Sequence, residues 1–363
     1  MTTTDTSRVI DQRIDKVVPL TTPALLHHEL PLDAALADTV LAGRRSVGRV
    51  LDRQDDRLLV VVGPCSVHDP AAALEYAHGL REVAGRLADD LLVVMRVYFE
   101  KPRSTVGWKG LINDPGLDGS GDVNTGLRTA RALLLEVLRL GLPVGCEFLD
   151  PITPQYIADT VAWGAIGART VESQVHRQLA SGLSMPIGMK NRPDGSIGTA
   201  VDAIRAAGVP HVFPGIDVSG TPAILHTRGN ADGHLVLRGA RGEPNYDAAS
   251  VAGALSLLRA AGLPERLVID ASHDNSGKDH RRQPVVAADV AAQLAAGQRG
   301  IVGVMLESFL VPGRQDLDPT RELVHGQSVT DACLGWPETA QVLTDLAAAV
   351  RARRAVVPAQ PTG

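Results

Sequence analysis

Short apolar runs alternate with longer amphipathic stretches along most of the chain. Each run is continuous and aliphatic, which is typical of a parallel strand that is buried on both faces. The stretches between the runs repeat apolar residues at helical spacing. We predict eight strands, at residues 58–65, 91–99, 143–149, 165–170, 186–190, 235–239, 267–273 and 303–308. We predict helices at residues 71–87, 126–140, 154–163, 200–207, 248–261 and 285–296.

Eight strands that alternate with helices favour an α/β fold of the (β/α)8 TIM-barrel type. The alternative is an open doubly wound sheet, but the first strand-to-helix turn has no Gly-x-Gly-x-x-Gly pattern. We expect a catalytic barrel at residues 46–354 with an inserted β-hairpin at residues 211–227. Two segments fall outside the barrel: an N-terminal arm, residues 1–45, for oligomer or regulatory contacts, and a disordered tail, residues 355–363.

The composition excludes several classes of partner. Only 3% of the 363 residues are aromatic, so the core is expected to be aliphatic. The net charge of −5 argues against a nucleic acid or a membrane surface as partner, and any anion site needs locally clustered Arg and Lys. Three cysteines do not make a disulfide scaffold. Because the chain has neither an apolar leader nor an apolar run of about 18 residues, we expect a cytoplasmic protein.

Reactive or charged residues stand at the end of almost every predicted strand. In a TIM barrel the strand ends and the loops after them form the functional face, so these side chains are expected to converge. Buried charges are costly unless they are paired or bind a ligand. The residues are Cys65, Arg96, Glu147, Arg169, Lys190, Arg238, His273 and Glu307, and Asp331 follows in the next loop.

Two groups with different chemistry can be separated within this set. The first comprises Cys65, His273, Glu307 and Asp331, a mixture of sulfur, nitrogen and oxygen donors that suits Mn²⁺, Fe²⁺, Co²⁺ or Zn²⁺ rather than Mg²⁺ or Ca²⁺. Taken singly, a cysteine is usually a small core residue and a histidine is usually satisfied by the protein, so position alone leaves both readings open.

The second group is cationic and predicts one or two substrates with several negative charges. Arg recognises phosphate and carboxylate in a bidentate manner, and Lys acts as a point charge. Surface salt bridges are the alternative, but apolar flanks such as VVMRVYF and LVLRG disfavour it. The group comprises Arg96, Lys101, Arg103, Arg169, Lys190 and Arg238.

Several long motifs of this chain resemble those of the type I 3-deoxy-D-arabino-heptulosonate 7-phosphate (DAHP) synthases. They are GPCSVHDP, RVYFEKPRSTVGWKGLINDP, GCEFLDPITPQY, IGMKN, GNADGHLVLRG, SHDNSGK, IVGVMLES and SVTDACLGW, and the match runs from about Arg57 to Trp336. The resemblance implies condensation of phosphoenolpyruvate with erythrose 4-phosphate, the first step of the shikimate pathway. It also implies one divalent metal ion, Mn²⁺ first, with Fe²⁺, Co²⁺ or Zn²⁺ as alternatives.

The resemblance assigns roles to the candidate residues. The implied metal ligands are Cys65, His273, Glu307 and Asp331. The implied phosphoenolpyruvate contacts are Arg96, Lys101, Arg169, Lys190 and Arg238. The implied erythrose 4-phosphate contacts are Lys101, Pro102, Arg103, Ser104 and Thr105. Lys101, Glu147, Lys190 and His273 are the implied catalytic residues, with Glu147 and Lys190 acting on the attacking water and its protons by hypothesis.

The resemblance also implies a homo-oligomer, a dimer or a tetramer, with a feedback inhibitor, Tyr or Phe, bound near the hairpin and the arm. The implied regulatory residues are Pro154, Gln155, Ser184 and Ile216. The chain departs from the usual motifs at Asp217 and Val218 of the hairpin loop, at Ala271, Asp274 and Phe309 and at the Arg192-Pro193 pair. These departures remove no implied ligand, but they bear on regulation and on the aldehyde that is accepted.

Three other functions compete with this prediction. A sister enzyme could use another aldose phosphate, although the Lys-Pro-Arg segment favours the four-carbon aldehyde. A non-catalytic relative could only bind a metabolite or an enzyme, but such proteins usually lose metal ligands. A metal-dependent aldolase with a similar barrel would not need so many cations.

Overall fold

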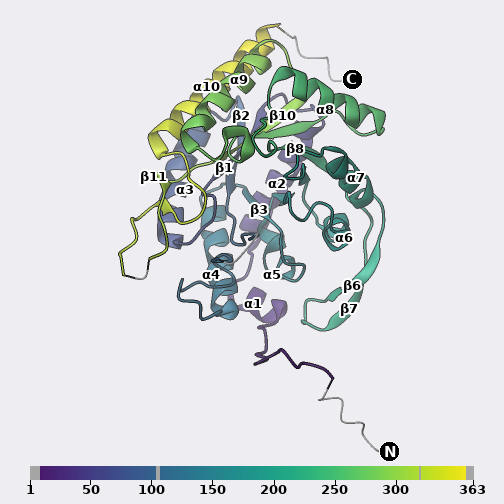
Figure 1. Ribbon diagram of the computed structural model, residues 1–363, viewed down its shortest axis with the longest axis vertical. Coiled ribbons are helices and arrows are strands. Elements are labelled where there is room, and N and C mark those ends of the chain that lie inside the picture. The colour runs from purple at the N-terminus through teal and green to yellow at the C-terminus, as the bar shows by residue number, and fades with distance from the viewer. Residues whose placement is uncertain (1–8, 104–106, 319, 357–363) are drawn as a thin grey trace, which may run out of the picture.

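The computed structural model describes residues 9–103, 107–318 and 320–356. Its parallel strands close into one barrel in the order β1-β10-β9-β8-β5-β4-β3-β2 (Figure 1). The predicted TIM barrel is therefore confirmed. The barrel strands are β1 (Leu58–Gly63), β2 (Leu91–Arg96), β3 (Val144–Glu147), β4 (Trp163–Ile166), β5 (Ile187–Lys190), β8 (His234–Leu237), β9 (Leu267–Asp270) and β10 (Ile301–Glu307).

Helices cover the outside of the barrel and connect its strands. Several begin at an Asp whose carboxylate accepts backbone N–H groups of the first turn, as Asp69 does for α3 and Asp247 for α8. The helices are α3 (Pro70–Arg86), α4 (Val123–Arg139), α5 (Pro154–Ile157), α6 (Gln174–Gly182), α7 (Gly198–Ala207), α8 (Ala248–Ala260), α9 (Gln283–Ala295) and α10 (Trp336–Val356). Short 3-10 turns, η2 (Ala158–Thr160), η3 (Asp274–Ser276) and η4 (His280–Arg282), complete three of the connections.

Side chains alternate between two apolar layers along each strand. In β1, Leu58, Val60 and Val62 pack outward against the helices, whereas Leu59 and Val61 belong to the cluster inside the barrel. Val47, Val50 and Leu51 of α2 (Ala34–Leu51) join the inner cluster. The end of α2 therefore closes the barrel at the N-terminal ends of the strands, and the opposite end is left for the site.

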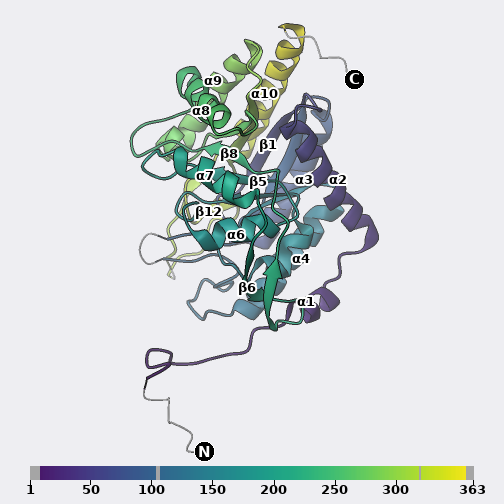
Figure 2. The same ribbon diagram turned by 90° about the vertical axis from the view of Figure 1, so that its right-hand side faces the viewer.

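The inserted hairpin is confirmed as the antiparallel pair β6 (Val212–Ile216) and β7 (Pro222–His226). It extends beside the barrel toward α1 (Pro23–Glu29), as both ribbon views show (Figure 2). The backbone N–H of Ala24 donates to the carbonyl of Val218 at 2.8 Å, so the hairpin tip holds the start of α1. The expected boundary between arm and barrel, after residue 45, falls inside α2.

Some predicted bounds differ from the structure. The helix predicted at residues 154–163 is shorter in the structure, where α5 ends at Ile157 and η2 follows, and β4 begins at Trp163 rather than at residue 165. Trp163 is fully buried and its indole N–H donates to Nε2 of His234 at 3.0 Å, which draws this residue into the sheet. Arg169 consequently lies beyond the strand, in the loop that follows β4.

Several elements were not predicted: α1, α2, α6, α10 and the strands β11 (Val311–Arg314) and β12 (Gln327–Ser328). Helix α10 extends to Val356, into the predicted tail, and residues 357–363 of that tail lie outside the described residues. None of the described helices is both long and apolar enough to cross a lipid bilayer.

Candidate active site and metal centre

A cavity of about 220 Å³ opens at the C-terminal ends of the barrel strands. Strand ends and the loops after them supply its wall, as expected for a TIM barrel. Most residues predicted from the strand ends therefore do converge. The lining residues are Lys101, Pro102, Arg103, Glu147, Gly167, Ala168, Arg169, Lys190, Arg238, His273, Lys278, Thr330 and Asp331.

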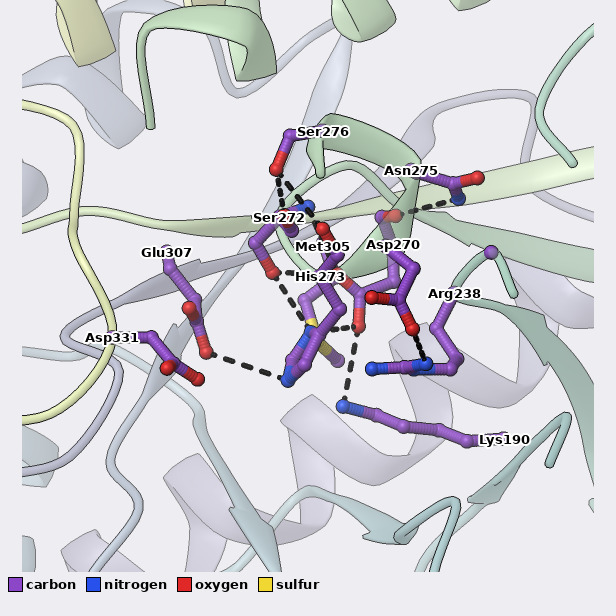
Figure 3. A network of polar contacts seen from close by, with 12 residues as sticks. Lys190, Arg238, Asp270, Ser272, His273, Asn275, Ser276, Met305, Glu307 and Asp331 are labelled. Atoms are coloured by element: carbon purple, nitrogen blue, oxygen red, sulfur yellow. Dashed lines mark hydrogen bonds and ion pairs between the residues drawn. The ribbon is translucent and has the colours of Figure 1, made fainter. Parts of the chain in front are cut away.

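Three of the four predicted metal ligands, Cys65, Glu307 and Asp331, form one group, and His273 lies beside Glu307. His273 and Asp331 are part of the cavity wall. Ligand atoms of Cys65, Glu307 and Asp331 all lie within 4.8 Å of one another. Nε2 of His273 lies 3.8 Å from a carboxylate oxygen of Glu307, and the imidazole faces both carboxylates (Figure 3). Residues separated by more than 260 positions thus form one cluster of sulfur, nitrogen and oxygen donors.

The imidazole of His273 is held by a residue that the sequence analysis missed. Nδ1 of His273 lies 2.8 Å from the carboxylate of Asp270, which also accepts the Ser272 hydroxyl at 2.6 Å (Figure 3). A carboxylate on Nδ1 fixes the tautomer in which Nε2 carries the free lone pair. Asp270 ends the apolar strand β9, and an acidic residue inside such a run is the signal that could have identified it.

The electrostatics of the cluster favour a bound cation. Burial raises the pKa of Cys65 to about 11, and Glu307 adds to this rise. The charge of Lys101, whose Nζ lies 3.0 Å from the Cys65 sulfur, opposes it. Burial works against ionisation of Asp331, but Lys101, His273 and Lys278 lower its pKa to about 2. A divalent cation would stabilise the thiolate and the crowded carboxylates, so these residues fit a metal site.

Five of the six predicted cations line the cavity: Lys101, Arg103, Arg169, Lys190 and Arg238. Lys278, which was not predicted, joins them and lies 4.0 Å from Asp331. The sequence analysis had quoted its motif, SHDNSGK, without giving this lysine a role. So many cations in one cavity indicate ligands with several negative charges.

Two carboxylates partly neutralise the positive charge of the cavity. Nζ of Lys190 lies 3.2 Å from Asp270 and 3.9 Å from Glu147. A Cβ at Gly167 would collide with the Glu147 carboxylate, so a larger residue there would displace that side chain from its place beside Lys190. Arg238 forms an ion pair with Asp274, one of the residues that depart from the family motifs.

Arg96 does not line the cavity. It is fully buried and donates to Glu307 at 2.8 Å and to the carbonyls of Pro64 and Cys65 at 3.1 and 3.0 Å. Its guanidinium also lies 3.6 Å from the centre of the Tyr98 ring. The structure therefore places Arg96 behind Cys65 and Glu307, and its implied contact with substrate stays a prediction. Ser104 and Thr105 lie outside the described residues.

A second cavity of about 720 Å³ lies away from the active site, between α5, the end of α6 and the hairpin. Its wall includes Pro154, Gln155 and Ser184, three of the four residues predicted for regulation. Ile216 is not part of that wall, because it packs against the apolar core instead. His27 and Arg44, from the arm, complete the side next to α5.

Comparisons with known proteins agree with this architecture. The DAHP synthetase I family matches residues 34–344. The Phe-sensitive phospho-2-dehydro-3-deoxyheptonate aldolase of Escherichia coli K12 is 54% identical over 344 residues, covering 95% of this chain and 98% of that protein. The phospho-2-dehydro-3-deoxyheptonate aldolase of Corynebacterium glutamicum is 53% identical over 352 residues, with 95% of each chain covered.

A solved structure, the phospho-2-dehydro-3-deoxyheptonate aldolase of Francisella tularensis SCHU S4, superposes with a TM-score of 0.92. It is 49% identical and the match covers 94% of this chain and 99% of that one. Sequence and fold thus agree over nearly the whole length, and this chain belongs to the DAHP synthetase I family.

Proposed function

We propose that this chain condenses phosphoenolpyruvate with erythrose 4-phosphate to give DAHP and inorganic phosphate, the first step of the shikimate pathway. The observation that carries the proposal is the meeting of a four-residue donor cluster and five predicted cations at one cavity. The printed names of the relatives describe the same enzyme under the name phospho-2-dehydro-3-deoxyheptonate aldolase. Two phosphorylated substrates, one with a carboxylate, account for the number of cations.

One divalent cation, Mn²⁺ first and Fe²⁺, Co²⁺ or Zn²⁺ as alternatives, would be held by Cys65, His273, Glu307 and Asp331. When bound, it would supply Lewis acidity at the aldehyde oxygen of erythrose 4-phosphate. The protein contributes the orientation of these ligands: Asp270 fixes the His273 imidazole and Arg96 holds Glu307 at 2.8 Å. Both supporting residues are fully buried, so the cluster is organised before substrate enters.

The cations of the cavity orient phosphoenolpyruvate and erythrose 4-phosphate, with Arg103 on the phosphate of the aldehyde. A bond forms between C3 of phosphoenolpyruvate and the aldehyde carbon, and the aldehyde oxygen takes up a proton. Water adds at C2, and the C2–O bond breaks so that phosphate leaves. Arg169, Lys190 and Arg238 stabilise the charge of the phosphate and carboxylate throughout.

Glu147 and Lys190 are the candidates for proton transfer at the water step. The Glu147 carboxylate lies 3.9 Å from Nζ of Lys190, and both side chains are less than one tenth exposed. Both line the cavity, so either can serve a water that adds at C2 after the new carbon–carbon bond has formed.

We further propose that an aromatic amino acid, Tyr or Phe, inhibits the enzyme from the second cavity. Relatives are named Phe-sensitive, Trp-sensitive and Tyr-sensitive. Pro154, Gln155 and Ser184 offer an apolar and polar wall, and the buried Nε2 of His27 has no hydrogen-bond partner among the described residues. The homo-oligomer, a dimer or tetramer, would involve the arm, where Val9, Val17 and Val18 are exposed.

The test measures phosphate release with both substrates, then with EDTA, then with Mn²⁺ returned. We expect release that EDTA abolishes and Mn²⁺ restores. A panel of aldose phosphates in the same assay separates erythrose 4-phosphate from longer aldehydes. No release with any aldehyde after Mn²⁺ is returned would favour a non-catalytic binding protein. Adding Phe, Tyr and Trp separately identifies the inhibitor, and equal rates with and without all three would refute the inhibition.

A further inference from the structure

We propose a second anion site, for a phosphate group, at the N-terminal end of the barrel, opposite the active site. A small cavity of about 50 Å³ lies where β1 and β10 begin and where α2 and α10 end. Because β1 and β10 are neighbours in the barrel, the residues just before them are brought together. The cavity is lined by Val50, Arg53, Asp55, Asp56, Arg57, Arg299, Ile301, Val302, Arg353 and Arg354.

The charges around this cavity do not balance. Asp55 is already paired with Arg57 at 2.6 Å, and Asp56 with Arg354 at 2.7 Å. Arg53, Arg299 and Arg353 remain as three cations with no carboxylate at ion-pair distance among residues 9–103, 107–318 and 320–356.

The three cations differ in how they are held. Arg53 donates to the carbonyl of Glu265, and Arg353 donates to the carbonyl of Asp56. Arg299 makes neither a hydrogen bond nor an ion pair with any described residue. Its guanidinium N–H groups are therefore available to donate hydrogen bonds to a ligand in the cavity.

The setting makes this unbalanced charge costly. Arg353 is only 9% exposed, and Val50, Ile301 and Val302 give the cavity apolar walls. Burial lowers the pKa of Arg353; the charge of Asp56 opposes this, and the charges of Arg354 and Arg299 lower the pKa further. Partial burial likewise lowers the pKa of Arg53; the charge of Glu265 opposes this, and the charge of Arg299 adds to the lowering. An anion among the three cations would relieve their repulsion.

The backbone at Arg53 is held in an uncommon conformation. Arg53 directly follows the cap of α2 and has a φ of 58°, in the left-handed region where glycine is favoured after a helix. A residue that keeps an unfavourable backbone conformation is usually required by its surroundings.

Helix ends offer a simpler explanation for part of the cluster. The C-terminal turns of α2 and α10 attract cations through the partial negative charge of their free carbonyls. This accounts for Arg353 and Arg354, which lie in the last turn of α10. It does not account for Arg299, which lies in the loop before β10 and donates to no helix carbonyl among the described residues.

The volume of the cavity favours a small anion such as phosphate. A single water needs a cavity of at least about 10–15 Å³, so this cavity of about 50 Å³ has room for a small anion. Arg53, Arg57 and Arg299 also line an adjoining open hollow of about 850 Å³. A phosphate group could thus enter as the free ion or at the end of a larger molecule whose remainder lies in the hollow.

The experiment titrates the whole enzyme with inorganic phosphate by calorimetry. The wild type is expected to show two binding events, since the active site also takes phosphate. Arg299→Gln should lose the second event, with at least a tenfold weaker affinity, and Arg169→Gln should lose the first. Arg139→Gln removes an exposed charge on α4 and should keep both events.

Two further measurements separate phosphate binding from a structural role of Arg299. Arg299→Lys retains the charge and should weaken phosphate binding less than Arg299→Gln does, which a merely structural role would not predict. Phenyl phosphate replaces inorganic phosphate to ask whether the group can belong to a larger molecule. The proposal fails if Arg299→Gln, folded and active, binds both probes with the stoichiometry of the wild type. It fails equally if Arg169→Gln abolishes all binding.

Discussion

Replacing Asp270 by Asn tests whether a buried carboxylate increases the metal affinity of the proposed site by orienting His273. Asp270 is fully buried and lies 2.8 Å from Nδ1 of His273 and 3.2 Å from Nζ of Lys190. Burial works against ionisation of Asp270, but His273 and Lys190 hold its pKa well below the usual range. The Asn side chain keeps the volume and removes the charge, so it isolates the electrostatic contribution.

Two effects of different size are expected from Asp270→Asn. Loss of the carboxylate that orients a metal-binding histidine typically weakens metal affinity about 10- to 100-fold, which corresponds to about 1.4–2.7 kcal/mol. Lys190 is 2% exposed and, among the residues that the structure describes, would retain only Glu147, at 3.9 Å, as an acidic partner. Breaking a buried ion pair costs about 3–5 kcal/mol, so the free energy of unfolding should fall by about 3 kcal/mol.

The assay is competition for Mn²⁺ with a metal-sensitive dye, combined with urea unfolding. Asp90→Asn is the matched control. Asp90 is also nearly buried and is paired with two cations, Arg351 and Arg354, and it is not part of the active-site cavity. The control should lose stability but keep its metal affinity. If folded Asp270→Asn bound Mn²⁺ within twofold of the wild type, the proposed role of Asp270 would be wrong.

Three other predictions follow from the same contacts. Glu147→Gln should lower kcat far more than it raises KM for either substrate. Steady-state phosphate release measures both constants, and an unchanged kcat would contradict the prediction. Burial raises the pKa of Glu100 from 4.5 to about 7 against the hydrogen bond from Thr153. The folded chain therefore keeps a proton that the unfolded chain loses, and stability should fall by about 3 kcal/mol as the pH rises from 4.5 to 8. Urea unfolding should show this fall in the wild type and not in Glu100→Gln, whereas equal slopes would refute it. Peroxide should inactivate the metal-free enzyme faster than the Mn²⁺-loaded one, because the metal occupies the Cys65 sulfur, and equal rates would argue against Cys65 as a ligand.

The sequence predicted the barrel and most of its functional face for one reason. In a closed parallel barrel every strand ends at the same rim, so residues as distant as Cys65 and Glu307 could be placed together without knowing any distance. The same reasoning placed Arg96 at the rim. The structure instead shows its side chain buried against Glu307 and Tyr98, because a strand position does not say which way a long side chain turns.

Elements and contacts that depend on neighbours were not predictable in this way. Asp270 stands inside an apolar run, and its role rests on the fold of the next three residues up to His273. The segment before β4 has helical spacing as far as Trp163, but burial of the indole against His234 overrides that local pattern. Helix α10 carries many Ala and Arg residues, and it becomes recognisable by its packing on α9.

The end of α2 closes the barrel, and this limits how many residues can be removed from the N-terminus. Val47, Val50 and Leu51 fill the barrel floor, and Arg44 donates to the carbonyls of Ala158 and Val161 at 2.7 and 2.9 Å. Shortening the chain up to residue 45 would cut through this helix and admit solvent to the inner layer. If the proposed inhibitor binds in the second cavity, this helix serves regulation as well as folding, and an insensitive enzyme should be sought by point substitution in that cavity rather than by truncation.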